Sequence, residues 1–96
     1  MSQNKCTVKA VRPCSGGGLV VTGYFGVGFS METLCAILEG LGQCSERLGV
    51  ARFTHEGHSV TLYRSGRFDV HRVESENAAI SLIDEIRPVI ESAFIE

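Results

Sequence analysis

The sequence predicts an α+β domain in which two helices cover one face of an antiparallel sheet and leave the other face open. Three observations predict this fold class: short segments with alternating apolar and polar residues, two longer segments with apolar residues at helical spacing, and glycine-containing turns between the last strands. A chain of 96 residues has room for one domain with a modest core, which we expect to span 1–96.

The first expected strand covers Cys6 to Arg12, where Val8 and Ala10 share one side of an alternating pattern. A proline and a run of three glycines then interrupt the pattern, as in a tight turn or a flexible link. We therefore divide the domain into an N-terminal strand with its glycine-rich link over 1–17 and a main unit over 18–95.

A second strand is expected from Leu19 to Phe25, which is rich in β-forming residues. The first helix should follow at Ser30, because a serine side chain can accept a hydrogen bond from the first turn and Glu32 suits the positive end of the helix dipole. Its apolar stripe extends to Leu41, and Gly40 and Gly42 are plausible stop signals.

Three further strands are expected at Val50 to His55, Ser59 to Tyr63 and Arg67 to Val73. A two-residue turn before the last strand would mix apolar and polar groups on both faces. A three-residue turn with Gly66 in the left-handed conformation instead pairs Leu62 with Phe68 and Val60 with Val70. We adopt the second register because it gives one apolar face.

The second helix is expected to begin after Ser75, with Glu76 in its first turn. Pro88 removes one backbone donor, so a kink or restart is expected near Arg87. The apolar stripe that would cover the sheet is long and consists of Ala79, Leu82, Ile83, Ile86, Val89, Ile90 and Phe94.

The predicted register leaves cations and aromatic rings on the face opposite the helices. Such side chains could contact phosphates and stack on bases, be buried in a homodimer or protein interface, or simply face solvent. We expect a non-enzymatic binding module that uses this face for self-association and for protein or nucleic-acid partners. The side chains expected on the face are Lys9, Thr22, Tyr24, Arg52, Thr61, Tyr63, Arg67 and His71.

The order of the elements and several local strings resemble one repeat of the TATA-box-binding protein family over about Gly18 to Phe94. A strand leads through Gly26 to a capped helix with similar spacing. The string Tyr63-Arg64-Ser65-Gly66-Arg67 resembles the family's Phe-x-Ser-Gly-Lys, and Ser75-Glu76 resembles the Ser-Glu pair that opens its last helix.

This resemblance implies a TATA-binding-protein-like half-repeat whose concave open face contacts the minor groove of DNA. It places Tyr63 and Leu48 where the family has phenylalanines that wedge between base steps, and it assigns Val20, Thr22 and Tyr24 to the open face. Because the family's chain contains two repeats, the resemblance also implies that this chain forms a homodimer to rebuild the complete saddle.

The cysteines raise an alternative of a different class, a thiol-ligated zinc or iron–sulfur protein. Their gaps, Cys6-x7-Cys14 and Cys35-x8-Cys44, lack the short Cys-x2-Cys spacing that brings two thiolates to one ion. Cys35 also lies on the apolar stripe of its helix, where a buried thiol serves as a small apolar filler. The candidate ligands are therefore Cys6, Cys14 and Cys44, while our main expectation is a protein without a cofactor.

Other polar motifs are expected to be structural. His55-Glu56-Gly57-His58 falls on a predicted turn and lacks the helical His-Glu-x-x-His spacing, so we interpret it as exposed turn polarity. The glycines at 16–18, 23, 26 and 28 match no phosphate-binding motif and fit turns and close packing. The carboxylates on or beside the last helix fit caps and solvated charge, and no catalytic set is evident: Glu74, Glu76, Asp84 and Glu85.

The composition favours a globular protein without a membrane-spanning segment. No apolar run approaches the roughly 20 residues that cross a bilayer, and Met1 to Lys5 is polar with no signal-peptide core behind it. We therefore expect the cytoplasm and reduced cysteines. A formal net charge of −2 argues against the uniform basic field of non-specific nucleic-acid binders, although a local basic patch is compatible with it.

Overall fold

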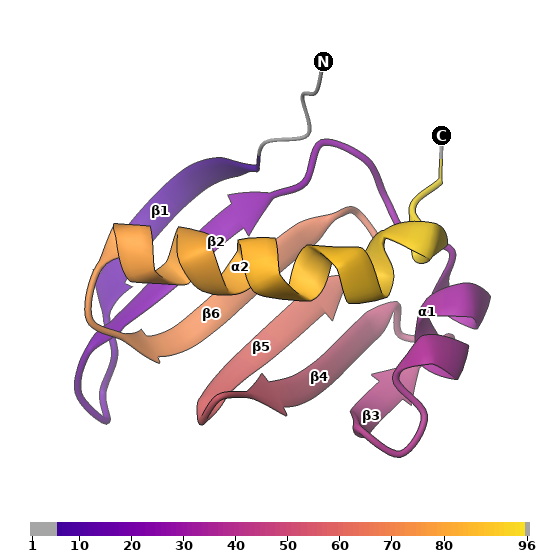
Figure 1. Cartoon of the computed structure of the whole chain (residues 1–96), viewed down its shortest axis with the longest axis horizontal. Coiled ribbons are helices and arrows are strands. Elements are labelled where there is room, and N and C mark those ends of the chain that lie inside the picture. The colour runs from indigo at the N-terminus through magenta and orange to yellow at the C-terminus, as the bar shows by residue number, and fades with distance from the viewer. Residues whose placement is uncertain (1–5, 96) are drawn as a thin grey trace.

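The computed structural model describes residues 6–95, and the expectation for Met1 to Lys5 lies outside this range. It confirms the α+β class: an antiparallel six-stranded sheet in the order β1-β2-β6-β5-β4-β3 and two α-helices (Figure 1). The strands are β1 (Thr7–Pro13), β2 (Leu19–Tyr24), β3 (Gly42–Ser45), β4 (Val50–His55), β5 (His58–Tyr63) and β6 (Arg67–Val73). The helices are α1 (Met31–Ile37), α2 (Glu76–Ile90) and the short 3-10 helix η1 (Glu91–Ala93).

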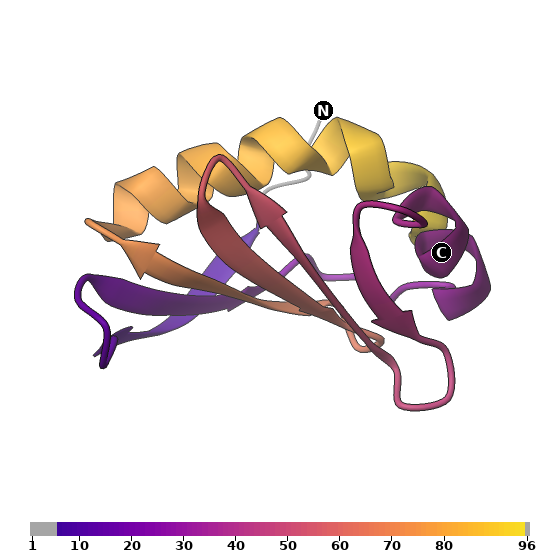
Figure 2. The ribbon, with the colours of Figure 1, turned by 90° about the horizontal axis from the view of Figure 1, so that it is seen from below.

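Both α-helices lie on the same side of the sheet, and the other side is left open (Figure 2). The long helix α2 runs across the sheet, and its buried side chains are Ala79, Leu82, Ile83, Ile86 and Ile90. Each large aliphatic side chain removed from water in this way contributes about 1.5–3 kcal/mol. Ser75 begins the helix as predicted, because its hydroxyl accepts a hydrogen bond of 3.0 Å from the backbone N–H of Ala78.

The predicted hairpin register is confirmed. Leu62 lies opposite Phe68 and Val60 lies opposite Val70, and all four side chains belong to the core. Gly66 has a φ of 96°, the left-handed conformation that the three-residue turn requires. A side chain at this position would also collide with the backbone carbonyl of Val27, so two independent constraints select glycine here.

The first strand departs from the predicted alternation. A bulge between Val8 and Ala10 shifts the register, so that Val8 pairs with Gly23 while Ala10 pairs with Thr22. The prediction that Val8 and Ala10 share one side is therefore wrong. An argument from strict alternation fails here because a bulge inserts one extra residue and turns the following side chains over.

The first helix is shorter than predicted. It ends at Ile37, Gly40 follows with a φ of 81°, and Leu41 is 61% exposed instead of continuing the apolar stripe. The next four residues, Gly42–Ser45, form the unpredicted strand β3, which pairs with β4 and provides one edge of the sheet. Of the two predicted stop signals, Gly40 thus lies just beyond the helix in a left-handed conformation, whereas Gly42 begins a strand.

The second helix continues through Pro88 to Ile90 before η1, and the predicted restart near Arg87 is not found. Pro88 is exposed and lies in the last turn of α2, which is arched over the sheet (Figure 2). The backbone carbonyl that loses its hydrogen-bond donor to the proline therefore lies near the end of the helix. Within residues 6–95, no helix has both the length and the apolar character needed to cross a membrane.

A disulfide joins Cys35 of α1 to Cys44 of β3 across a sequence separation of 9 residues. The expectation that all four cysteines are reduced is therefore wrong, and Cys35 is not a free thiol that fills the core. The pairing depends on β3, which brings Cys44 back alongside α1 and which the sequence pattern did not reveal. Cys6 and Cys14 are free and half-buried.

Candidate functional site

The open sheet face is the candidate site, and strand pairing places the predicted side chains across it. Asp69 of β6 lies between Thr22 of β2 on one side and Thr61 of β5 on the other. Thr61 in turn lies opposite Arg52 of β4. These four residues alternate with core residues along their strands, so they form one row across the face that points away from the helices.

Asp69 is the centre of a hydrogen-bond network on this face. Its carboxylate is buried and accepts hydrogen bonds from the Thr22 hydroxyl at 2.7 Å and from the Tyr63 hydroxyl at 3.2 Å. The Arg67 guanidinium donates to both carboxylate oxygens at 3.2–3.3 Å. Sequence reasoning gave Asp69 no role, because the convergence of its partners depends on the pairing of three strands.

Two cations lie against the tyrosines of the same face. The Arg67 guanidinium is 4.8 Å from the centre of the Tyr63 ring, and the Lys9 ammonium is 5.9 Å from the centre of the Tyr24 ring. Both distances are within the range of a cation–π contact. The expected positions of Lys9 and the two tyrosines are therefore consistent with the structure, which also brings cation and ring together.

Arg12 is a member of this face that sequence reasoning missed. It lies opposite Val20, and its guanidinium is 3.4 Å from the Thr22 hydroxyl. The bulge after Val8 explains the omission, because the side on which Arg12 lies depends on the extra residue. Val20 itself is buried on the open face, outside the main core cluster.

The tyrosine hydroxyl in the Asp69 network is held in its neutral form. Partial burial raises the pKa of Tyr63 above its ordinary value of 10.0, and the neighbouring Asp69 carboxylate raises it further, while Arg67 opposes the shift. A neutral phenol donates a hydrogen bond to a carboxylate, which is the role that the 3.2 Å contact shows. Tyr63 is therefore a fixed donor at neutral pH.

Not every predicted side chain is accessible to a partner. Thr61 is 1% exposed, and its hydroxyl is buried without a hydrogen-bond partner among the described residues. Thr22 is also buried, beneath its contacts with Arg12 and Asp69. These two threonines lie beneath the surface, whereas the side chains that remain partly or fully exposed are Lys9, Arg12, Tyr24, Arg52, Tyr63, Arg67 and His71.

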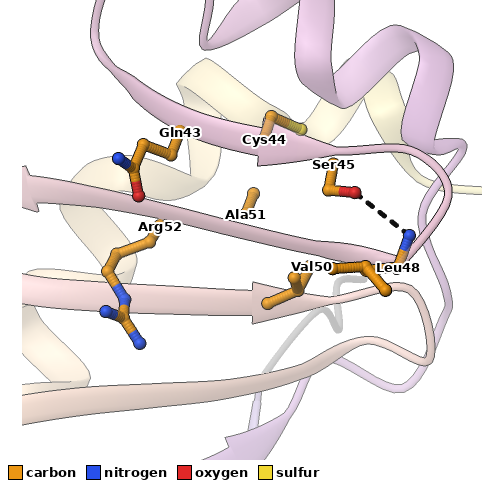
Figure 3. A pocket seen from close by; sticks show the side chains of 7 residues that line it. All are labelled: Gln43, Cys44, Ser45, Leu48, Val50, Ala51 and Arg52. Atoms are coloured by element: carbon orange, nitrogen blue, oxygen red, sulfur yellow. Dashed lines mark hydrogen bonds between the residues drawn. The ribbon is translucent and has the colours of Figure 1, made fainter.

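A hollow lies at the β3–β4 end of the sheet, and its lining includes Leu48, Val50 and Arg52 (Figure 3). Leu48 is 72% exposed in the turn between β3 and β4, and its backbone N–H donates to the Ser45 hydroxyl at 3.1 Å. Val50 lies opposite Tyr63 in the sheet, so the hollow adjoins the Asp69 network. The assignment of Leu48 and Tyr63 to wedge positions stays a prediction.

Charge is distributed unequally between the sheet and the helix layer. Asp69 is the only acidic residue in the six strands, and it is already paired with Arg67. The strands contribute three further cations to the open face, Lys9, Arg12 and Arg52. In contrast, five carboxylates lie on or beside α2 and η1: Glu74, Glu76, Asp84, Glu85 and Glu91.

Only two of the three predicted cysteine ligands have a free thiol. Cys44 is bonded to Cys35, which leaves Cys6 and Cys14 as free thiols in the described chain. Burial raises the pKa of the Cys6 thiol above its ordinary value of 9.0, and the nearby Asp84 carboxylate raises it further. Since the thiolate is the form that binds a metal, this environment disfavours Cys6 as a ligand.

The chain matches no protein-family model, and no curated protein sequence matches it.

Proposed function

We propose that this protein is a binding module rather than an enzyme, and that its open sheet face contacts duplex DNA through the phosphate backbone. The observation that carries the proposal is the set of cations on this face, Lys9, Arg12, Arg52 and Arg67, set against one buried and paired carboxylate, Asp69. Lysine and arginine side chains supply most of the affinity of proteins for nucleic-acid phosphates.

The aromatic side chains support the same partner. Tyr24 and Tyr63 each lie beside a cation, so a nucleic acid on this face would meet rings and positive charge together. The resemblance to one repeat of the TATA-box-binding protein family supports minor-groove contact by the open face, with Tyr63 and Leu48 at the wedge positions. Leu48 is exposed in its turn and Tyr63 is fixed by Asp69.

The overall negative charge is a weaker objection than the composition suggested. The net charge of −2 sums over the whole chain, whereas five of its carboxylates lie on or beside α2 and η1, in the layer opposite the proposed surface. A surface that attracts phosphate needs local positive charge, which the strands supply.

Binding of a short fluorescent DNA duplex should therefore weaken as salt is added, and Arg52→Ala should weaken it further at every salt concentration. Arg52 is exposed on β4, whereas Arg67 is unsuitable for the test because its removal would leave the Asp69 carboxylate without its cation. Loss of one phosphate contact should reduce the slope of log affinity against log salt by about 1. Fluorescence anisotropy at several salt concentrations measures both effects.

The matched control is Asn77→Glu, an exposed position in the first turn of α2 that changes the net charge by the same amount on the other side of the molecule. A glutamate in the first turn is compatible with the helix dipole. The proposal fails if the parent protein does not bind DNA at low salt, or if Asn77→Glu weakens binding as much as Arg52→Ala.

Self-association is the second candidate function, favoured by the exposed apolar side chain at the hollow between β3 and β4. Leu48 is 72% exposed there beside Val50, and a second copy of the chain could bury it. Leu48→Asp should then shift a dimer to a monomer in sedimentation analysis. Leu41→Asp is the control, since Leu41 is 61% exposed but lies outside this hollow. A parent protein that is monomeric at high concentration would reject this candidate.

The cytoplasmic location remains a prediction. The disulfide between Cys35 and Cys44 counts against it, because most cytosolic proteins keep their cysteines reduced.

A further inference from the structure

Three side chains with metal-binding chemistry converge at the end of the β4–β5 hairpin, away from the open face. The His55 Nε2 atom is 2.9 Å from a carboxylate oxygen of Glu85 and 4.0 Å from one of Glu56. The ligand atoms of all three residues lie within 4.8 Å of one another. Sequence reasoning interpreted His55 and Glu56 as exposed turn polarity and did not connect them with Glu85, which is 30 residues away from His55.

The fold explains why these residues meet. His55 follows Ala51 and Phe53 at alternate positions of β4, so its ring lies on the helix side of the sheet. The two-residue turn after it has Glu56 at a φ of 52° and Gly57 at 83°, and the turn rises to the level of α2 in Figure 2. Glu85 reaches this turn from the exposed side of α2.

A second imidazole lies beside the cluster. His58 pairs with His55 across the hairpin, and it lines a hollow together with Glu56 and Glu85. Its Nδ1 atom is buried and has no hydrogen-bond partner among the described residues. One nitrogen of His58, a residue that lines this hollow, therefore has a hydrogen-bonding capacity that the described residues do not use.

We propose that His55, Glu56 and Glu85 bind a divalent transition-metal ion, with Zn²⁺ as the representative. An imidazole and two carboxylates form a mixed nitrogen and oxygen ligand set, which suits zinc and its neighbours better than calcium or magnesium, whose protein ligands are oxygens. Ligands at about 2.1 Å from a tetrahedral zinc ion lie about 3.4 Å from one another. The two distances from His55, 2.9 and 4.0 Å, lie on either side of that value.

The exposure of the site fits a bound ion that retains water. The side chains of His55, Glu56 and Glu85 are 31%, 67% and 51% exposed. They can therefore make the adjustment of up to about 1.4 Å between the present spacing, within 4.8 Å, and the ligand spacing of about 3.4 Å without disturbing the core. Three protein ligands leave at least one coordination position for water or for an external ligand. The alternative is that His55 and Glu85 form a simple hydrogen bond and bind no ion. Zinc titration distinguishes a metal site from this hydrogen bond.

The test is calorimetric titration of the tag-free full chain with Zn²⁺, with Cys6→Ser and Cys14→Ser introduced so that the two free thiols cannot bind the ion. We expect one zinc ion per chain. His55→Ala and Glu85→Gln should each weaken binding at least about tenfold, because removal of a direct ligand should have at least the effect of removing an outer partner. Zinc should also raise the melting temperature of the parent but not of His55→Ala.

The controls are His71→Ala, which removes a histidine of the open face, and Glu91→Gln, which removes an exposed carboxylate of η1. Both should bind zinc like the parent. All four substitutions are at exposed or half-exposed positions, and melting curves without zinc verify that each variant is folded. The proposal is overturned if the parent does not bind zinc, or if His55→Ala and Glu85→Gln bind it as tightly as the controls do.

Discussion

Replacing Phe68 with alanine is expected to lower the free energy of unfolding by about 3–5 kcal/mol, because it leaves a cavity in the core. The Phe68 side chain is buried, its ring centre is 5.0 Å from that of Phe25, and it lies over Gly23, where a Cβ atom would be 2.5 Å from the Phe68 ring. No smaller side chain can fill this space without a shift of the sheet. Equilibrium unfolding in urea measures the loss.

The control is Thr54→Ala, at an exposed position of β4. A surface substitution of this kind usually changes stability by at most about 0.5 kcal/mol. The two variants together test the assignment of residues to faces. Similar losses for Phe68→Ala and Thr54→Ala would contradict the register that places Phe68 opposite Leu62 in the core.

The second large effect is expected from the disulfide. Opening the bond between Cys35 and Cys44, by reduction or by replacing both with serine, should lower the free energy of unfolding by about 2–3 kcal/mol for a sequence separation of 9 residues. The bond restricts the unfolded chain and fixes α1 to the short strand β3. Urea unfolding with and without a reducing agent measures the change.

A variant with Cys6→Ser and Cys14→Ser isolates the contribution of the bond, because reduction can then act only on Cys35 and Cys44. The same loss of stability should appear in this background. If reduction leaves the unfolding midpoint unchanged, the disulfide is not present in the purified protein or does not stabilise it.

Much of the hairpin region could be predicted from sequence because one physical condition fixes it. Leu62, Phe68, Val60 and Val70 share a face in only one of the two registers considered, and Gly66 permits the turn that this register needs. A register error would expose every apolar side chain of the pair, so the pattern carries strong information.

Other parts of the fold depend on distant partners and left no comparable pattern. The strand Gly42–Ser45 is four residues long and carries no alternation of apolar residues, so it forms because β4 provides its hydrogen-bonding partner. The bulge after Val8 likewise depends on how β1 meets β2. The disulfide could not be predicted without knowledge of β3, because this strand brings Cys44 to Cys35.

The candidate site was predictable as a face but not as a network. Alternation along β5 and β6 places Thr61, Tyr63 and Asp69 on the open side. The convergence of hydrogen-bond donors on Asp69 requires the pairing of β2 with β6, which joins residues 47 positions apart. The contact between His55 and Glu85 was hidden for the same reason, because it joins a hairpin turn to a helix.

The separation of charge between the strands and α2 gives this thin molecule two electrostatically different sides. Its shortest dimension is 20 Å, whereas the Debye length at physiological ionic strength is about 8 Å. An approaching molecule therefore senses mainly the charges of the side that it approaches, and hardly those of the far side. A polyanion would therefore orient the open sheet face toward itself before contact, whereas a polycation would orient the α2 side toward itself. The net charge of −2 describes neither encounter.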